Sequence, residues 1–132
     1  MAARILIIED NKANLELVEY LLEASGYATF AARDGEEGIR GARKEHPDLI
    51  ICDLQMPIMD GYEVVRELKK DPLLRPIPVI AVTALSMAGD RNNVLAAGFD
   101  GYLSKPIEPE TFVLTVEGFL PPGLRAPRSP DA

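Results

Sequence analysis

Two apolar segments of the chain are each followed by carboxylates. Residues 5–8 read Ile-Leu-Ile-Ile and precede Glu9 and Asp10, and residues 49–52 read Leu-Ile-Ile-Cys and precede Asp53. Continuous apolar runs of this length are typical of strands that a parallel sheet buries on both faces. Because ligands bind beyond the carboxyl ends of such strands, we expect the three carboxylates to converge at one edge of the sheet. Their mutual repulsion requires a cation, and a hard divalent metal is the natural candidate.

Two later segments are followed by groups of a different kind. Thr83 follows the apolar run 79–82, and Lys105 follows a short segment at about 101–103, with Pro106 after it. A hydroxyl donor and a cation beside three carboxylates suit phosphoryl transfer, in which catalysis consists mostly of positioning the phosphoryl group and neutralising its charge. The expected second strand, at about 27–31, ends in no comparable group, which is consistent with a place at the edge of the sheet.

The period of the apolar residues switches repeatedly between that of a strand and that of a helix. Strands are expected at about 5–8, 27–31, 49–53, 79–83 and 101–103, each followed by a helix, and these helices end near residues 25, 44, 70, 97 and 120. Asp34 and Asp60 begin capping boxes, Ser86 can cap a helix, and Gly26 and Gly98 stand just beyond helix ends. The alternation predicts an α/β protein with a five-stranded, doubly wound parallel sheet.

Length and composition limit the classes of protein to which the chain can belong. With 132 residues it is expected to form one folded domain, and its net charge of −7 argues against a nucleic-acid-binding surface. Cys52 is the only cysteine and His46 the only histidine, which excludes an internal disulfide and a zinc site built from several such ligands. No stretch approaches the ~20 apolar residues of a membrane span, so we expect a cytoplasmic protein that binds neither membrane nor nucleic acid.

Four motifs, taken together and in this order, resemble the receiver domain of two-component response regulators. They are IIEDN at 7–11, CDLQMPIMDG at 52–61, VTA at 82–84 and SKP at 104–106. The resemblance extends over about residues 3–120. Among receivers, the sequence looks most similar to those of hybrid histidine kinases and to single-domain regulators. It implies a receiver domain at 1–120 with a flavodoxin-like strand order of 2-1-3-4-5. The Pro-rich residues 121–132 lack any period and are expected to form a flexible tail or linker.

The resemblance implies a phosphoacceptor and a metal site at the two acidic strand ends. Asp53 would accept a phosphoryl group from a phosphohistidine of a histidine kinase or a histidine phosphotransfer protein. Mg²⁺ would be held by Glu9, Asp10, Asp53 and the backbone carbonyl of Gln55, and Mn²⁺ could substitute for it. The chain would catalyse only its own phosphorylation and dephosphorylation, so we expect a signalling protein and not an enzyme.

The resemblance also implies which residues surround the phosphoryl group. Thr83 would hydrogen-bond one phosphoryl oxygen, and Lys105 would form an ion pair with another, with a cis peptide before Pro106 aiming the lysine side chain. Gln55 and Leu85 would flank the path of the water that slowly hydrolyses the acyl phosphate. These two residues are therefore expected to tune the rate of self-dephosphorylation.

Tyr102 stands at the position of the family's switch aromatic on the last strand. The resemblance implies that its ring turns inward once Thr83 moves toward the phosphoryl group. The surface that changes would comprise the helix after Ser86, the last strand and the final helix, and it would bind a downstream protein. The final helix carries six apolar residues within nine positions, which is consistent with ordinary core packing or with a partner surface that could form a weak homodimer.

Other interpretations of the same residues stay open. Asp53 could be a strand-end residue satisfied by a helix N-terminus, and Tyr102 could be an ordinary core or rim residue. A small metal-dependent phosphatase using an aspartyl phosphate is an alternative function, but it would need a second carboxylate at the position of Gln55. A degenerate receiver that only binds proteins is a third alternative, against which the complete set of strand-end residues argues.

Overall fold

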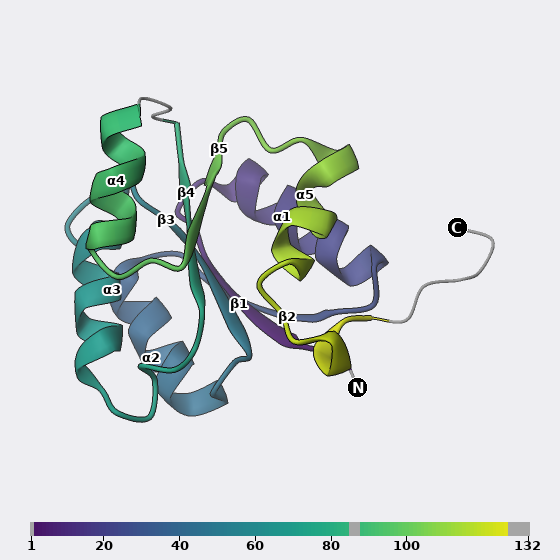
Figure 1. Cartoon of the computed structure of the whole chain (residues 1–132), viewed down its shortest axis with the longest axis horizontal. Coiled ribbons are helices and arrows are strands. Elements are labelled where there is room, and N and C mark those ends of the chain that lie inside the picture. Colours follow the sequence, from purple (N-terminus) through teal and green to yellow (C-terminus); the bar gives the residue numbers. More distant parts are fainter. Residues whose placement is uncertain (1, 85–87, 127–132) are drawn as a thin grey trace.

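Five strands and five helices alternate along the chain in a computed structural model (Figure 1). The strands are β1 Arg4–Ile8, β2 Ala28–Ala32, β3 Leu49–Asp53, β4 Val79–Thr83 and β5 Gly101–Ser104. The helices are α1 Lys12–Ala24, α2 Gly35–Glu45, α3 Gly61–Lys70, α4 Ala88–Ala96 and α5 Pro109–Glu117, followed by the 3₁₀ turn η1 Pro122–Leu124. The structure describes residues 2–84 and 88–126, and for residues 88–91 it describes the backbone alone.

The strands form one parallel sheet in the order β2-β1-β3-β4-β5, which confirms the predicted flavodoxin-like topology. Ile8 of β1 lies opposite Cys52 of β3 in the register of the sheet. The residues that follow them, Glu9 and Asp53, therefore leave neighbouring strands at the same level. β2 forms the edge of the sheet next to β1, as predicted for the strand without a functional group at its end.

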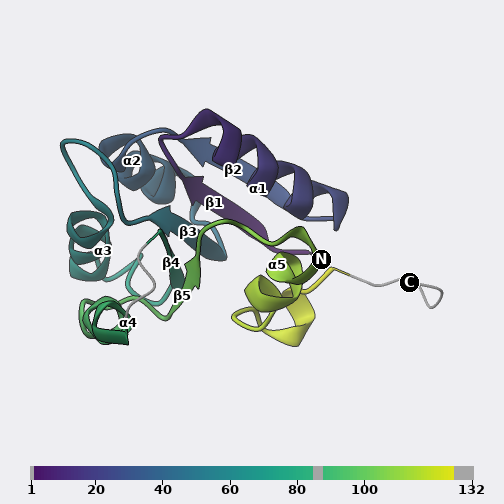
Figure 2. The same ribbon diagram turned by 90° about the horizontal axis from the view of Figure 1, so that it is seen from above.

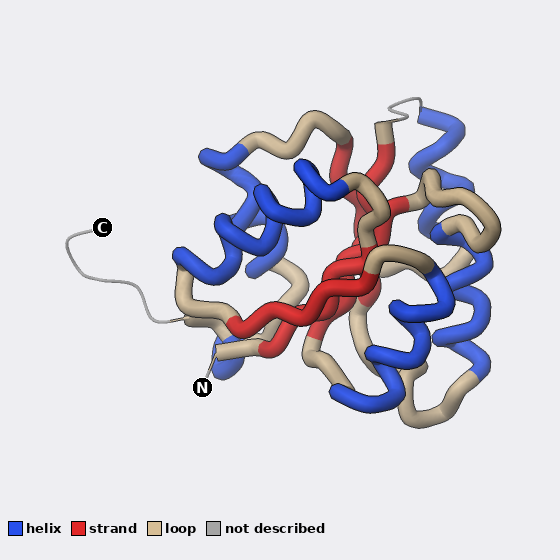
Figure 3. Tube along the Cα trace, turned by 180° about the vertical axis from the view of Figure 1, so that it is seen from behind, coloured by secondary structure: helices blue, strands red, loops and turns tan. Residues whose placement is uncertain are grey.

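Helices cover both faces of the sheet (Figure 2), and Figure 3 shows the sheet from behind as a central layer between them. α1 and α5 pack on one face together with Ile5 and Ile7 of β1, whereas α2, α3 and α4 pack on the other face with Leu6 and Ile8. Successive side chains of a strand point to opposite faces, so a sheet covered on both sides needs apolar residues at every position. This explains the unbroken apolar runs of β1, β3 and β4.

Helix ends follow the predicted capping chemistry. The carboxylates of Asp34 and Asp60 each accept a hydrogen bond from the backbone N–H three residues further on, at 2.8 and 3.0 Å. Gly26 and Gly98 adopt φ angles of +99° and +116° just beyond α1 and α4, a conformation that glycine adopts without a Cβ clash. The predicted cap Ser86 lies outside the described residues. No helix in the described part of the chain is long and apolar enough to cross a membrane.

Residues 121–126, which follow α5, pack against the rest of the domain. The carbonyl oxygen of Leu124 accepts a hydrogen bond from the backbone N–H of Ala3 at 2.8 Å. Ala126 is buried, and its N–H donates to the hydroxyl of Tyr27 at 2.9 Å. Residues 121–126, which belong to the predicted tail or linker, therefore make contacts with the other end of the chain that local composition does not reveal. Residues 127–132 lie outside the described residues.

Deletion of residues 121–132 is expected to lower the free energy of unfolding by about 2–4 kcal/mol, because it removes buried apolar surface and leaves Ala3 and Tyr27 without these hydrogen-bond partners. Urea unfolding followed by circular dichroism measures the change. Deletion of residues 127–132 alone retains the contacts of Leu124 and Ala126 and is the matched control. Equal stability of the two deletion variants would contradict a structural role for residues 121–126.

Candidate functional site

The carboxyl ends of β1 and β3 bring three acidic side chains together. One oxygen from each of Glu9, Asp10 and Asp53 lies within 4.8 Å of the other two. Glu9 and Asp53 are buried, with 5% and 3% of their surface exposed, while Asp10 is partly exposed. Buried carboxylates at this separation repel one another unless a cation or a proton offsets their charge. The arrangement is that of an oxygen-only site for a hard divalent ion.

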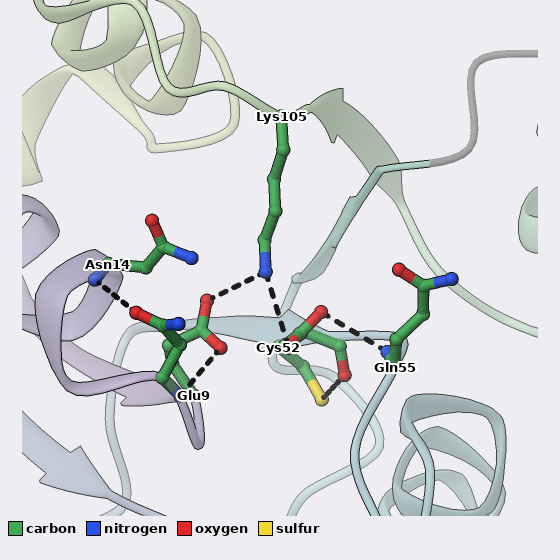
Figure 4. Close-up of polar contacts among 7 residues, drawn as sticks. Glu9, Asn14, Cys52, Gln55 and Lys105 are labelled. Carbon is green, nitrogen blue, oxygen red and sulfur yellow. Dashed lines mark hydrogen bonds and ion pairs between the residues drawn. The ribbon is translucent and has the colours of Figure 1, made fainter.

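Lys105 reaches these acids from the end of β5 (Figure 4). Its Nζ lies 3.2 Å from Oε1 of Glu9 and 3.4 Å from Oδ2 of Asp53. The Lys105–Pro106 peptide is cis, as the sequence resemblance implied. The backbone N–H of Lys105 donates to the carbonyl oxygen of Thr83 at 2.7 Å, so the ends of β4 and β5 are tied together beside the acids. Within the described part of the chain, Lys105 is therefore the cation that offsets part of the charge of the three carboxylates.

The protonation of the site reflects this balance of charge. Burial, together with the hydrogen bond and the charge of Asp53, raises the pKa of Glu9 to about 7 against the opposing effects of the Asn11 N–H and the charge of Lys105. Burial alone would lower the pKa of Lys105, but the charges of Asp53 and Glu9 outweigh that effect and raise it. The surrounding acids therefore favour the cationic form of Lys105, whereas the raised pKa of Glu9 brings its protonation close to neutral pH.

Backbone groups hold the carboxylate of Asp53 in place. The N–H of Gln55 donates to Oδ1 of Asp53 at 3.1 Å. The N–H of Gly61, the first residue of α3, donates to the carbonyl oxygen of Leu54 at 3.0 Å. A Cβ at Gly61 would lie 2.7 Å from the carbonyl oxygen of Asp53, so glycine is required for α3 to approach β3 this closely. Gly61 therefore shapes the loop beside Asp53 through this close approach of two backbones.

The first turn of α1 holds Glu9 in a similar way. The N–H of Asn11 donates to Oε2 of Glu9 at 3.2 Å, and Oδ1 of Asn11 accepts from the N–H of Asn14 at 3.0 Å, which caps α1. The sequence interpretation assigned no role to Asn11. A polar Asn just before the first residue of an apolar helical period is a recognised N-cap signal and could have identified it.

The other predicted residues lie around this cluster in different environments. Thr83 is fully buried at the end of β4. It lies opposite Ser104 of β5, the residue that precedes Lys105. Tyr102 is half-buried on β5 and packs against the apolar core beneath α2, α3 and α4. The side chain of Gln55 is exposed beside the acids (Figure 4). Leu85 lies outside the described residues.

Cys52 adjoins the site in sequence but takes no part in its chemistry. Its side chain is completely buried, and burial, followed by the charge of Asp53, raises the pKa of the thiol far above its usual range. A thiol that cannot ionise is neither a nucleophile nor a metal ligand. The reactive groups at this edge of the sheet are therefore the carboxylates and Lys105.

Comparisons with known proteins agree with this geometry. The sequence profile described as Response regulator receiver domain matches residues 5–117. The Polar-differentiation response regulator DivK of Brucella ovis is 46% identical over 120 residues, which cover 91% of this chain and 98% of that protein. Chemotaxis response regulator CheY4 of Vibrio cholerae has a TM-score of 0.87 at 30% identity, over 91% of this chain and 100% of that chain.

A second solved structure bears on the acidic cluster. The receiver domain of a sensor histidine kinase from Pseudomonas aeruginosa PAO1 has a TM-score of 0.82 at 34% identity, over 90% of this chain and 98% of that chain. That structure has a magnesium ion coordinated in the active site cleft. The relatives thus include a response regulator of similar length as well as the receiver of a kinase, the two groups that the sequence resembles.

Proposed function

The chain belongs to the response regulator receiver domain family of two-component signalling, and from this premise we propose that Asp53 is its phosphoacceptor. The observation that carries the proposal is the placement of Asp53 next to Lys105 and to the two acids that follow β1. An oxygen of the Asp53 carboxylate attacks the phosphorus of a phosphohistidine. The O–P bond forms as the N–P bond of the donor breaks, and the imidazole leaves with the electron pair of that bond.

Glu9, Asp10, Asp53 and the backbone carbonyl of Gln55 would hold Mg²⁺, for which Mn²⁺ could substitute. The donor set supports this choice, because hard cations prefer oxygen ligands. In addition, the positive charge of Lys105 does not balance the negative charges of the three carboxylates. The bound ion would neutralise charge on the phosphoryl oxygens. Lys105 is close enough to Asp53 to offset the charge of another phosphoryl oxygen, and Thr83 would donate its hydroxyl to a third.

The partner that supplies the phosphoryl group would be a histidine kinase or a histidine phosphotransfer protein in the cytoplasm. The signal would leave through the surface of α4, β5 and α5, where Tyr102 responds to Thr83 and a downstream protein binds. Exposed Leu95 on α4 and Leu114 on α5 support an apolar contact there, with a protein target or in a weak homodimer. The expected chemistry of the chain is limited to its own phosphorylation and slow dephosphorylation.

Incubation with Mg²⁺ and acetyl phosphate, followed by intact-mass spectrometry, tests this function. We expect a mass increase of one phosphoryl group that requires the metal and disappears on chelation. A phosphatase would instead turn over a generic phosphate ester, and a binding module would remain unmodified under both conditions. The exposed amide of Gln55 at the position where a phosphatase needs a second acid favours the receiver.

Binding of Mg²⁺ is expected to depend on pH around neutrality. Since the pKa of Glu9 is raised to about 7 and the metal binds the carboxylate form, protons compete with the metal below that pH. The apparent Kd for Mg²⁺ should rise by up to about tenfold for each pH unit below 7, in addition to any contribution from the other ligands. Titration calorimetry at pH 6, 7 and 8 measures it. Glu9→Gln should bind more weakly and lose most of this dependence, and a parent Kd that stays constant over this range would contradict the assignment.

We propose that Leu85 flanks the path of the water that hydrolyses the acyl phosphate, and that it thereby tunes the rate of dephosphorylation. An apolar side chain offers the attacking water no hydrogen bond, so Leu85→Glu and Leu85→Asn should change the decay rate of the acyl phosphate while phosphorylation still occurs. The decay of purified phosphorylated protein, followed by intact mass after removal of acetyl phosphate, measures the rate. A decay rate equal to that of the parent chain in both variants would exclude this role.

A further inference from the structure

The sheet has an open edge at β2. This strand pairs with β1 on one side, and no other described strand lies along its second side (Figure 2). The carbonyl oxygen of Ala32 accepts a hydrogen bond from the N–H of Glu9 and so points toward β1. Because backbone groups alternate in direction along a strand, the N–H and C=O groups of Thr29 and Ala31 point to the open side. The sequence of β2 holds neither a charged residue nor proline, the usual protections of an exposed edge.

A groove of about 440 Å³ lies beside this edge, between β2 and α2. Its apolar lining includes Leu6 and the half-buried ring of Phe30. Cζ of Arg4 lies 4.8 Å from the centroid of that ring, and Nη1 of Arg4 donates to the carbonyl oxygen of Glu45 at 2.6 Å. A cation–π contact therefore holds Phe30 beside the end of α2. An apolar side chain that enters the groove would meet a ring whose position is already fixed, which lowers the entropic cost of binding.

Gly41 keeps this groove open without a benefit to the fold. It lies inside α2 and lines the groove. A Cβ at Gly41 would lie 3.6 Å from Cδ1 of Leu6, which is an ordinary van der Waals contact, so alanine would fit. At Gly38, by contrast, a Cβ would lie 2.4 Å from Cδ1 of Ile8, so packing requires glycine there. Since glycine destabilises the interior of a helix relative to alanine, packing does not account for Gly41, and occupation of the groove would.

The α1 side of the same edge is acidic. Oγ1 of Thr29 donates to Oε2 of Glu23 at 2.8 Å, which places this carboxylate of α1 beside β2. Glu19 and Glu16 lie one and two helical turns before it. Burial, followed by the charges of Glu23 and Glu16, raises the pKa of Glu19, so the three acids act on one another. Among the described residues, an ion pair reaches only Glu16, from Lys12 at 3.9 Å. This side of the edge therefore favours a basic partner.

We propose that β2 accepts an extended segment of another protein as an additional strand, and that apolar and basic residues alternate along this segment. Successive side chains of a strand point to opposite faces, so the apolar ones would enter the groove and the basic ones would face the acids of α1. The groove itself is balanced in charge, because two acids and two bases line it: Glu37, Glu45, Arg40 and Lys44. Binding at β2 does not require phosphorylation of Asp53, so it is independent of the function proposed above.

A second copy of the chain suits this edge less well than such a segment. Two antiparallel copies of β2 would be related by a two-fold axis perpendicular to the sheet. That symmetry keeps α1 of both copies on the same face, so the acids of one α1 would meet the same acids of the other. Like charges that face each other across a pair of strands are destabilising.

Two synthetic peptides of about seven residues, titrated into the isotope-labelled full chain and followed by NMR, test the surface. Lys and Val alternate in the first peptide, and Glu replaces Lys in the second. We expect the Lys-Val peptide to shift resonances of β2, α1 and α2, and to slow hydrogen exchange at the amides of Thr29 and Ala31. The Glu-Val peptide should bind at least about tenfold more weakly. Equal affinity for both peptides, or no saturable binding of the Lys-Val peptide, would overturn the proposal.

Two variants separate binding at the edge from general effects on the fold. Gly41→Ala places a methyl group in the groove, and should raise Tm by about 2–4 °C while weakening the Lys-Val peptide by about fivefold or more. Ala31→Pro removes an N–H that points to the open side, where an edge strand tolerates proline, and should weaken it further. Gly123→Ala makes the same glycine-to-alanine change away from the groove and should bind as the parent does. A Kd of Gly41→Ala within twofold of the parent would refute this role of the groove, and sedimentation that shows the parent pairing with itself through β2 would identify a second copy as the occupant instead.

Discussion

The variant Asp53→Asn is expected to lose phosphorylation by acetyl phosphate, with a rate more than about 10²-fold below that of the parent chain. The asparagine amide has nearly the shape of the carboxylate but is a far poorer nucleophile. Its oxygen can still accept the hydrogen bond from the N–H of Gln55 that the parent donates to Oδ1. Lys105 also keeps its ion pair with Glu9, so the fold of the site is retained. Intact-mass spectrometry over a time course measures the loss.

A matched substitution shows whether the effect belongs to Asp53. Asp34→Asn makes the same chemical change at the N-cap of α2, where asparagine caps a helix about as well as aspartate. This variant should be labelled at the parent rate. Persistent labelling of Asp53→Asn would mean that another carboxylate accepts the phosphoryl group, and the assignment of Asp53 would then be wrong.

The variant Gly61→Ala is expected to lower both the stability of the domain and its rate of phosphorylation. The added Cβ would lie 2.7 Å from the carbonyl oxygen of Asp53 and 2.8 Å from Cα of Leu54, and both neighbours are backbone atoms that cannot turn aside. Helix α3 must therefore shift away from β3, at a cost of about 1–3 kcal/mol. Urea unfolding measures this loss. Because the shift also displaces Asp53, labelling by acetyl phosphate should slow by about tenfold.

Gly123→Ala is the matched control for this substitution. Apart from Gly123 itself and its two neighbours in the chain, no heavy atom of the described residues lies within 4 Å of a Cβ built at Gly123 on the 3₁₀ turn η1. The control should unfold within about 0.5 kcal/mol of the parent, as surface substitutions usually do. If Gly61→Ala were as stable as Gly123→Ala, the close approach of α3 to β3 would not be the reason why position 61 requires glycine.

Periodic patterns in the sequence were enough to predict the elements of this fold. The unbroken apolar runs before Glu9 and Asp53 identified buried parallel strands, because a strand covered on both faces needs an apolar residue at every position. The capping residues Asp34 and Asp60 identified two helix starts, because a cap bonds to a backbone group only three residues away. The strand ends then placed the acids, Thr83 and Lys105 at one edge, since parallel strands end on the same side.

Tertiary structure decided the features that depend on contacts between distant residues. Nothing local to residues 121–126 shows that Ala126 bonds to Tyr27 across the domain. The bridge from Lys105 to both Glu9 and Asp53 depends on how far three separate strand ends stand apart. The positive φ angle of Ile58, +71°, likewise occurs in a loop whose two flanking segments pack closely against α2 and β3.

One physical reason explains why some of these features could be predicted from the sequence and others could not. Solvation and local hydrogen bonding act along the chain with the periods of helix and strand, so the residue types themselves record which elements form and which groups stand at their ends. The distances at which those groups meet, and the segments that cover them, depend on the packing of the whole chain. Sequence by itself therefore determined the elements and the chemistry available at the sheet edge, and packing decided how Asp53 is held and which groups surround it.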